Sequence, residues 1–137
     1  MFENPTAEEI GQILRTTRTI AVVGFSPKPD RPSYRVARAL QDFGYRIIPV
    51  RPLLSEGLGE TAYASLRDLP GAPDLVDVFR ASDTVEEIVD DCIAIGAKRL
   101  WLQEGVVNEK AAARARAAGI TVVMDRCVWK DYRALGS

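Results

Sequence analysis

Residues 19–33 read TIAVVGFSPKPDRPS, and this stretch decides the fold. Five mostly apolar residues predict a buried strand that ends at Gly24. A proline-rich turn follows, and apolar residues at helical spacing then predict a helix over residues 33–43. A buried strand that runs through a glycine turn into a helix is the first half of a mononucleotide-binding βαβ unit. In that unit the N–H groups at the helix N-terminus receive a phosphate.

The rest of the chain continues this alternation of strands and helices. Thr6 and Glu9 match a capping box at the start of a short leading helix. Strands are expected at residues 19–23, 45–50, 74–80, 99–102 and 121–124, with a short edge strand at 60–63. Alternating helices imply parallel strands with right-handed crossovers. We therefore predict one α/β domain over residues 1–137, a three-layer, Rossmann-like, doubly wound parallel sheet of about five to six strands in the order 3-2-1-4-5-6.

The residues that directly follow the strands are the candidate ligand site. In doubly wound sheets a ligand binds at the carboxyl ends of the strands, where the strand order reverses. This rule selects residues 24–33, 51–52, 79–80, 103–105 and 125–127. Four of these five segments contain an arginine, which favours an anionic ligand.

Two departures from the NAD-binding pattern narrow the choice of ligand. The glycine fingerprint G-x-G-x-x-G is absent, and Arg51 follows the second strand where an NAD site usually has an acidic residue. Arginine suits a phosphate better than a free ribose diol. NADP, with its 2′-phosphate, and coenzyme A (CoA), with its 3′-phosphate, both fit. A solvated loop position for Arg51 is the alternative.

Composition excludes several classes of protein. The chain has 137 residues, of which 47% are hydrophobic and 27% are charged, as in a soluble globular domain. A net charge of −1 and the lack of a basic run predict no nucleic-acid ligand. No apolar stretch approaches the roughly 20 residues that cross a bilayer. The N-terminal residues lack a signal-peptide pattern and two cysteines suit a reducing compartment, so we expect a cytoplasmic protein.

The chain contains no histidine, the commonest general base and nitrogen ligand of metals. We therefore predict no catalytic residue and no metal site, although carboxylate, lysine or cysteine chemistry stays open. Asp77 and Asp125, near strand ends, are expected to orient a neighbouring arginine rather than to act as bases. Cys92 lies on the apolar stripe of its helix and is expected in the core. Cys127 follows a strand end beside Arg126, where it is either packed or reactive.

Taken together, these segments resemble the small stand-alone CoA-binding proteins of bacteria, relatives of the CoA-binding domain of succinyl-CoA synthetase and of ADP-forming acyl-CoA synthetases. The resemblance runs from about residue 17 to residue 130. Its pieces are VVGxS at 22–26, PxRxS at 29–33, GYxIxPVxP at 44–52, YxSLxDxP at 63–70, DVFR at 77–80, AK at 97–98, WxQxG at 101–105 and DRC at 125–127.

The resemblance implies CoA or an acyl-CoA as the ligand. The pyrophosphate would lie against the turn at residues 24–33, the adenosine end would face residues 50–53, and the remaining segments would line the rest of the crevice. The candidate binding residues are Gly24, Phe25, Ser26, Lys28, Arg31, Ser33, Val50, Arg51, Pro52, Phe79, Arg80, Gln103, Gly105, Arg126 and Cys127. Relatives usually carry asparagine at the position of Arg51. The synthetases also use a catalytic histidine on a partner segment, and this chain has none.

Three functions are consistent with these features. The first is a CoA-binding or acyl-CoA-binding protein without chemistry of its own, such as a carrier, a sensor or a regulator of an unidentified partner. The second is an NADP-binding module or a small reductase. The third is a thiol-redox protein in which Cys127 reacts with the CoA sulfur.

Overall fold

A five-stranded parallel sheet forms the centre of the computed structural model, which describes residues 1–135. The strands lie in the order β2-β1-β5-β6-β7. Their bounds are β1 Thr19–Val23, β2 Arg46–Val50, β5 Leu75–Val78, β6 Arg99–Leu102 and β7 Thr121–Met124. This architecture confirms the predicted α/β fold with helices on both faces of a parallel sheet.

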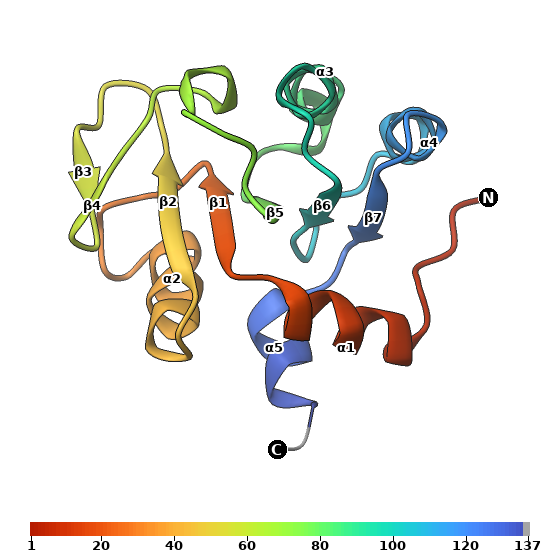
Figure 1. Ribbon diagram of the computed structural model, residues 1–137, viewed down its shortest axis with the longest axis horizontal. Coiled ribbons are helices and arrows are strands. Elements are labelled where there is room, and N and C mark those ends of the chain that lie inside the picture. The colour runs from red at the N-terminus through yellow and green to blue at the C-terminus, as the bar shows by residue number, and fades with distance from the viewer. Residues whose placement is uncertain (136–137) are drawn as a thin grey trace.

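Helices cover both faces of the sheet, so the molecule has three layers (Figure 1). The layer on one face consists of α1 Ala7–Thr16, α2 Pro32–Asp42 and α5 Val128–Arg133, and that on the other of α3 Val85–Ile95 and α4 Glu109–Ala117. Strand side chains alternate between two apolar cores. Val76 and Val78 of β5 face the α3 and α4 side, whereas Leu75 faces the α1, α2 and α5 side.

The expected short strand at residues 60–63 is wrong in detail. Strands β3 Glu56–Gly57 and β4 Glu60–Thr61 form a separate antiparallel hairpin. Tyr63 joins the main sheet through an isolated parallel bridge to Val50. The predicted order 3-2-1-4-5-6 therefore loses its outermost strand, and the other five keep their places.

Local sequence signals set several helix ends as expected. Glu9 N–H donates to Thr6 Oγ1 at 3.2 Å while Thr6 N–H donates to Glu9 Oε1 at 2.8 Å, which completes the capping box of α1. Gly96 ends α3 in the left-handed region, at φ 76°. None of the helices in residues 1–135 has the length and apolar character of a membrane-crossing segment.

The N-terminal segment runs along the outer edge of β7. The side-chain amide of Asn4 bonds both backbone groups of Met124: Asn4 Nδ2 donates to the Met124 carbonyl at 2.9 Å, and Met124 N–H donates to Asn4 Oδ1 at 2.8 Å. Phe2 further packs under the guanidinium of Arg116, whose carbon lies 4.0 Å from the ring centroid. These contacts fix the segment against the last strand.

Candidate ligand-binding crevice

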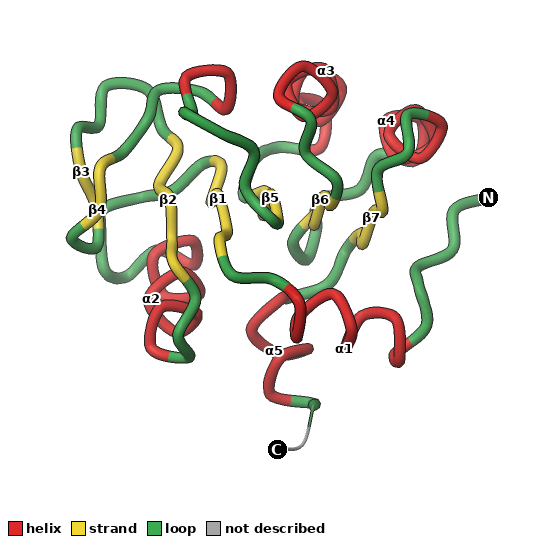
Figure 2. The backbone as a smooth tube through the Cα atoms, in the orientation of Figure 1, coloured by secondary structure: helices red, strands yellow, loops and turns green. Residues whose placement is uncertain are grey.

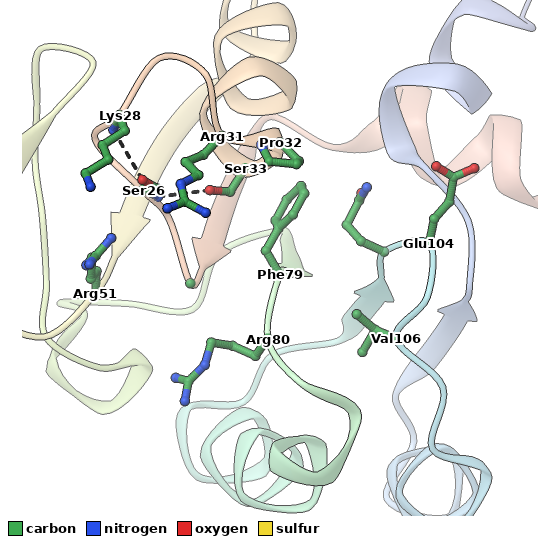
Figure 3. Close-up of a pocket in the computed structure, with 12 residues that line it drawn as sticks. Ser26, Lys28, Arg31, Pro32, Ser33, Arg51, Phe79, Arg80, Glu104 and Val106 are labelled. Carbon is green, nitrogen blue, oxygen red and sulfur yellow. Dashed lines mark hydrogen bonds between the residues drawn. The ribbon is translucent and has the colours of Figure 1, made fainter.

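A crevice of about 530 Å³ opens at the carboxyl ends of β1, β5 and β6, beside the start of α2. Its walls are the loops that leave these strands, which the tube drawing shows in green at the tips of the strands (Figure 2). Figure 3 draws its lining side chains. The lining residues are Gly24, Ser26, Lys28, Arg31, Pro32, Ser33, Arg51, Phe79, Arg80, Gln103, Glu104 and Val106.

Two serine hydroxyls shape the turn before α2. Ser26 N–H donates to Ser33 Oγ at 2.9 Å, and Lys28 N–H donates to Ser26 Oγ at 3.2 Å (Figure 3). Because each hydroxyl already accepts one of these bonds, its own O–H remains to donate elsewhere. The turn is thus held by bonds that leave two hydroxyl donors facing the crevice.

The start of α2 presents further donors to the crevice. Its N-cap residue is Arg31 and its first residue is Pro32, and within the described residues no side chain caps this end. The first N–H groups of a helix have no intrahelical partner, and the helix dipole places partial positive charge there. An anion in the crevice would satisfy both features.

Gly24 allows the exits of β1 and β5 to approach closely. Its φ is 85°, in the left-handed region, and a Cβ at this position would lie 2.4 Å from the Phe79 carbonyl oxygen. Side chains are therefore excluded here by both conformation and space. Glycine is therefore required at this position by the backbone packing that forms the floor of the crevice.

Four cations from three segments of the chain line the crevice: Lys28, Arg31, Arg51 and Arg80 (Figure 3). None of them takes part in the ion pairs found within residues 1–135. Within residues 1–135 the guanidinium of Arg51 makes one long hydrogen bond, from Nη1 to the Phe25 carbonyl at 3.4 Å. These guanidinium and ammonium groups are thus available to an anion.

The other end of the crevice has a different character. Phe79 and Val106 are apolar, and Gln103 is the polar group beside them. The carboxylate of Glu104 bonds Lys130 Nζ at 2.9 Å, which raises the pKa of that lysine. Positive charge therefore gathers at one end of the crevice, and an apolar wall with one amide forms the other.

The wall around Gln103 is held by backbone contacts. Val106 N–H donates to the Gln103 carbonyl at 2.9 Å, which closes a tight turn with Gly105 at φ 84°. Gly105 N–H donates to Asp125 Oδ1 at 2.7 Å. Asp125 is therefore a backbone anchor.

Within residues 1–135 neither Asp125 nor Asp77 pairs with an arginine, so the expectation that they orient one is wrong.

Two smaller cavities adjoin the cationic end and share Arg80 with the crevice. One, of about 400 Å³, also involves Phe25, Arg51 and Pro52. The other, of about 200 Å³, runs past Val50 and Pro52 toward α3. Together they extend the crevice beyond the exit of β2.

The strand-end rule placed most of the candidate residues together. The predicted residues that line the main crevice are Gly24, Ser26, Lys28, Arg31, Ser33, Arg51, Phe79, Arg80 and Gln103. Val50, Pro52 and Phe25 belong to the adjoining cavities, although the Phe25 side chain itself is fully buried. The sequence reasoning missed Pro32 and Glu104, which lie inside the selected segments but carry no positive charge, and Val106, one residue beyond them.

Three candidates do not line the crevice. Arg126 turns to Asp131, with two hydrogen bonds of 2.7 and 2.8 Å that raise the pKa of the arginine. Cys127 is 7% exposed and packs in the core on the α1, α2 and α5 side. Gly105 directs its N–H to Asp125. A ligand-binding role for these three stays a prediction.

Cys92 lies in the core as expected, and burial raises the pKa of its thiol to about 12.

Asp77 lies one layer beneath the crevice floor. In the sheet it sits between Val22 of β1 and Trp101 of β6, and the residues two positions further along these strands, Gly24, Phe79 and Gln103, line the crevice. Its side chain is fully buried and neither carboxyl oxygen has a partner within the described residues. Burial raises the pKa of Asp77 well above its ordinary value.

Comparison with known proteins assigns this chain to a family. A sequence model described as a CoA binding domain matches residues 18–133, which is most of the chain. The protein belongs to the CoA-binding domain family. Its sequence is 43% identical over 127 residues to the uncharacterized protein YneT of Bacillus subtilis, covering 93% of this chain and 94% of YneT.

Two solved structures and one larger protein are also similar to this chain. A hypothetical protein from Pyrococcus horikoshii has a TM-score of 0.92 and 35% identity, with all of both chains covered. A protein from Thermus thermophilus has a TM-score of 0.91 and 35% identity, with 96% of this chain and 99% of that one covered. The alpha subunit of an ADP-forming acetate–CoA ligase from Pyrococcus furiosus is 28% identical over 122 residues, which are 81% of this chain and 27% of the ligase subunit.

Proposed function

We propose that this protein binds CoA or an acyl-CoA in the crevice and performs no chemistry of its own on it. The observation that carries the proposal is the group of four cations without carboxylate partners, set around an uncapped helix start in a member of the CoA-binding domain family. The ligase subunit that shares this region is named for a reaction of CoA.

The chemistry of CoA matches the two ends of the crevice. Its pyrophosphate suits the donors at the start of α2 and the hydroxyls of Ser26 and Ser33. Its 3′-phosphate suits the guanidinium groups of Arg51 and Arg80, which border the adjoining cavities. Its uncharged arm, a chain with two amide groups, suits the apolar wall of Phe79 and Val106.

A binding role without catalysis follows from the residues that face the crevice. The chain contains no histidine. Asp77, in the layer beneath the floor, is fully buried, and Glu104, the carboxylate in the lining, accepts a hydrogen bond from Lys130. Cys127 is packed in the core rather than at the crevice wall, which weighs against the thiol-redox alternative. We therefore propose a carrier, sensor or regulatory module.

Titration calorimetry with four ligands tests this proposal. CoA is expected to bind tighter than dephospho-CoA by about 10- to 100-fold, because one charge-assisted phosphate contact contributes about 1.5–3 kcal/mol. NADP and NAD are expected to bind weaker than CoA, and NAD weakest because it lacks the additional phosphate. Tighter binding of NADP than of CoA would favour the reductase alternative, and no binding of CoA at concentrations up to millimolar would refute the proposal.

A further inference from the structure

Gln103 is a buried amide in the wall of the crevice. It directly follows β6, lines the crevice and is only 5% exposed. Its Oε1 accepts a hydrogen bond of 3.2 Å from Val128 N–H, the first backbone donor of α5. The side chain therefore stands between the ligand space and the start of a helix.

The contact with α5 fixes which end of the amide is which. A backbone N–H can only donate, so the atom that faces Val128 must be the amide oxygen. The amide nitrogen then points away from Val128, and within residues 1–135 the Nε2 group has no hydrogen-bond partner. Rotation of the amide by half a turn would set two donors against each other, so the orientation is locked.

The backbone of Gln103 is equally fixed. Its N–H donates to the Val78 carbonyl at 3.2 Å, and its carbonyl accepts from Val106 N–H at 2.9 Å. The side chain thus has little freedom to turn toward another partner. Among residues 1–135 the fully buried side-chain atoms without a partner belong to Asp77 and Glu86, so Gln103 Nε2 keeps access to the crevice, where a ligand acceptor can take its hydrogen bond.

Neutral acceptors fit this donor better than phosphates do. The lining residues beside Gln103 are Phe79, Val106 and Glu104, whose carboxylate bonds Lys130, and the four crevice cations come from the exits of β1, β2 and β5. Phosphates are better placed among those cations. We propose that Gln103 Nε2 donates a hydrogen bond to a carbonyl oxygen in the uncharged arm of the ligand, and that Gln103 thereby selects ligands that carry an amide or thioester chain. This inference rests on the proposed function.

The variant Gln103→Glu tests this role. A glutamate keeps an oxygen for Val128 N–H and nearly the same shape, but at neutral pH it loses the donor toward the ligand. Binding of CoA is expected to weaken about tenfold or more, since a carbonyl would then face a carboxylate. Adenosine 3′,5′-bisphosphate carries phosphates but no carbonyl arm, and its affinity is expected to change less than threefold. Gln12→Glu, an exposed change on α1, adds the same charge away from the crevice and serves as the control.

Acidification separates a donor from a merely structural residue. Protonation of the introduced carboxylate in the Gln103→Glu variant restores an O–H donor, so the ratio of wild-type to variant affinity for CoA is expected to shrink from pH 7.5 toward pH 5.5. If Gln103→Glu does not fold, Gln103→Met provides the same comparison of CoA with the bisphosphate at similar side-chain volume.

Two results would overturn the inference. One is an equal loss of affinity for CoA and for the bisphosphate, which would make Gln103 only a support for α5. The other is an unchanged affinity for CoA. Failure of the proposed function gives a different result, because neither CoA nor the bisphosphate would then bind the wild-type protein.

Discussion

Two kinds of ionisable side chain without ion-pair partners in residues 1–135 lie in neighbouring layers of this protein, and they differ in their access to water. The cations Lys28, Arg31, Arg51 and Arg80 line an open crevice. The carboxyl group of Asp77, in the next layer of the sheet, is fully buried. An unpaired charge in water costs little and can bind a counter-charge from solution. An unpaired carboxyl group in a dry interior must be neutral or lower the stability of the fold.

The largest expected effect comes from Asp77, through the free energy of unfolding. Its pKa is raised in the folded protein, so the folded state holds the proton more tightly than the unfolded state does. Below about pH 4, the ordinary pKa of an aspartate, both states hold the proton and stability is unaffected. As the pH rises from there toward the folded pKa, the protein loses about 1.4 kcal/mol of stability per pH unit.

Asp77→Asn replaces the titratable carboxyl group with a neutral amide of nearly the same shape. The difference in unfolding free energy between variant and wild type is therefore expected to grow in favour of the variant as the pH rises above about 4. Urea denaturation at several pH values measures it. A difference that stays constant with pH would mean that Asp77 ionises freely and that the interior around it is not dry.

The next largest effect is on the affinity for CoA, and it distinguishes arginines in the crevice from arginines in ion pairs. Arg80→Met is expected to weaken CoA binding about 10- to 100-fold, because it removes a charge-assisted contact. Its melting temperature should stay within a degree or two of wild type, since Arg80 has no ion pair within residues 1–135.

Arg114→Met is the matched control. Arg114 joins α4 to α3 through Asp90 at 2.7 Å and lies at 3.8 Å from Glu86. Its loss is expected to lower stability by up to about 1 kcal/mol, as for other exposed ion pairs, and to leave CoA affinity unchanged. If both variants lost affinity equally, the contrast between free and paired arginines would have no functional meaning.

A smaller loss of CoA affinity is expected when the hydroxyl donor in the turn before α2 is removed. Ser26→Ala removes one O–H from the phosphate site and one acceptor from Lys28 N–H. Because Lys28 N–H is exposed to water, the melting temperature should change little, while CoA affinity falls about tenfold. Calorimetry and thermal denaturation of the same samples check both statements. A large drop in melting temperature would make Ser26 a structural residue.

The smallest effect is expected at Arg51, which already shares its Nη1 with the Phe25 carbonyl. Arg51→Asn replaces the guanidinium with a shorter, neutral amide. The preference for CoA over dephospho-CoA is expected to fall about threefold, because an exposed guanidinium contributes up to about 1 kcal/mol and asparagine retains a neutral donor. An unchanged preference would assign the 3′-phosphate to another cation.

The positions of the strand ends could be predicted from sequence, and the directions of the side chains beyond them could not. Gly24 and Arg80 directly follow short buried strands, so the topology alone brings them to one crevice. Arg126 follows β7 in the same way, but Asp131, five residues later, attracts its guanidinium. That competition depends on where α5 begins, and no local pattern around residue 126 reveals it.

Pairing and packing between elements limited the prediction in two other places. Cys127 lies at the expected position along the chain, yet α1, α2 and α5 close over it to form one core. The segment at residues 60–63 has the composition of a strand, but β3 offers it a nearer partner than the sheet does. The first outcome depends on contacts between helices far apart in sequence, and the second on a local hairpin that competes with the sheet.

The amide of Asn4 has a consequence for how copies of this protein meet in solution. The outer strand of a sheet carries unsatisfied N–H and C=O groups that can recruit a strand from another molecule. At Met124, on the β7 edge, both groups are already bonded to Asn4. On the β2 edge, Tyr63 N–H donates to the Pro49 carbonyl and the Tyr63 carbonyl accepts from Arg51 N–H. Both borders of the sheet are therefore blocked at these positions by the chain itself, which disfavours growth into fibrils by edge-to-edge addition.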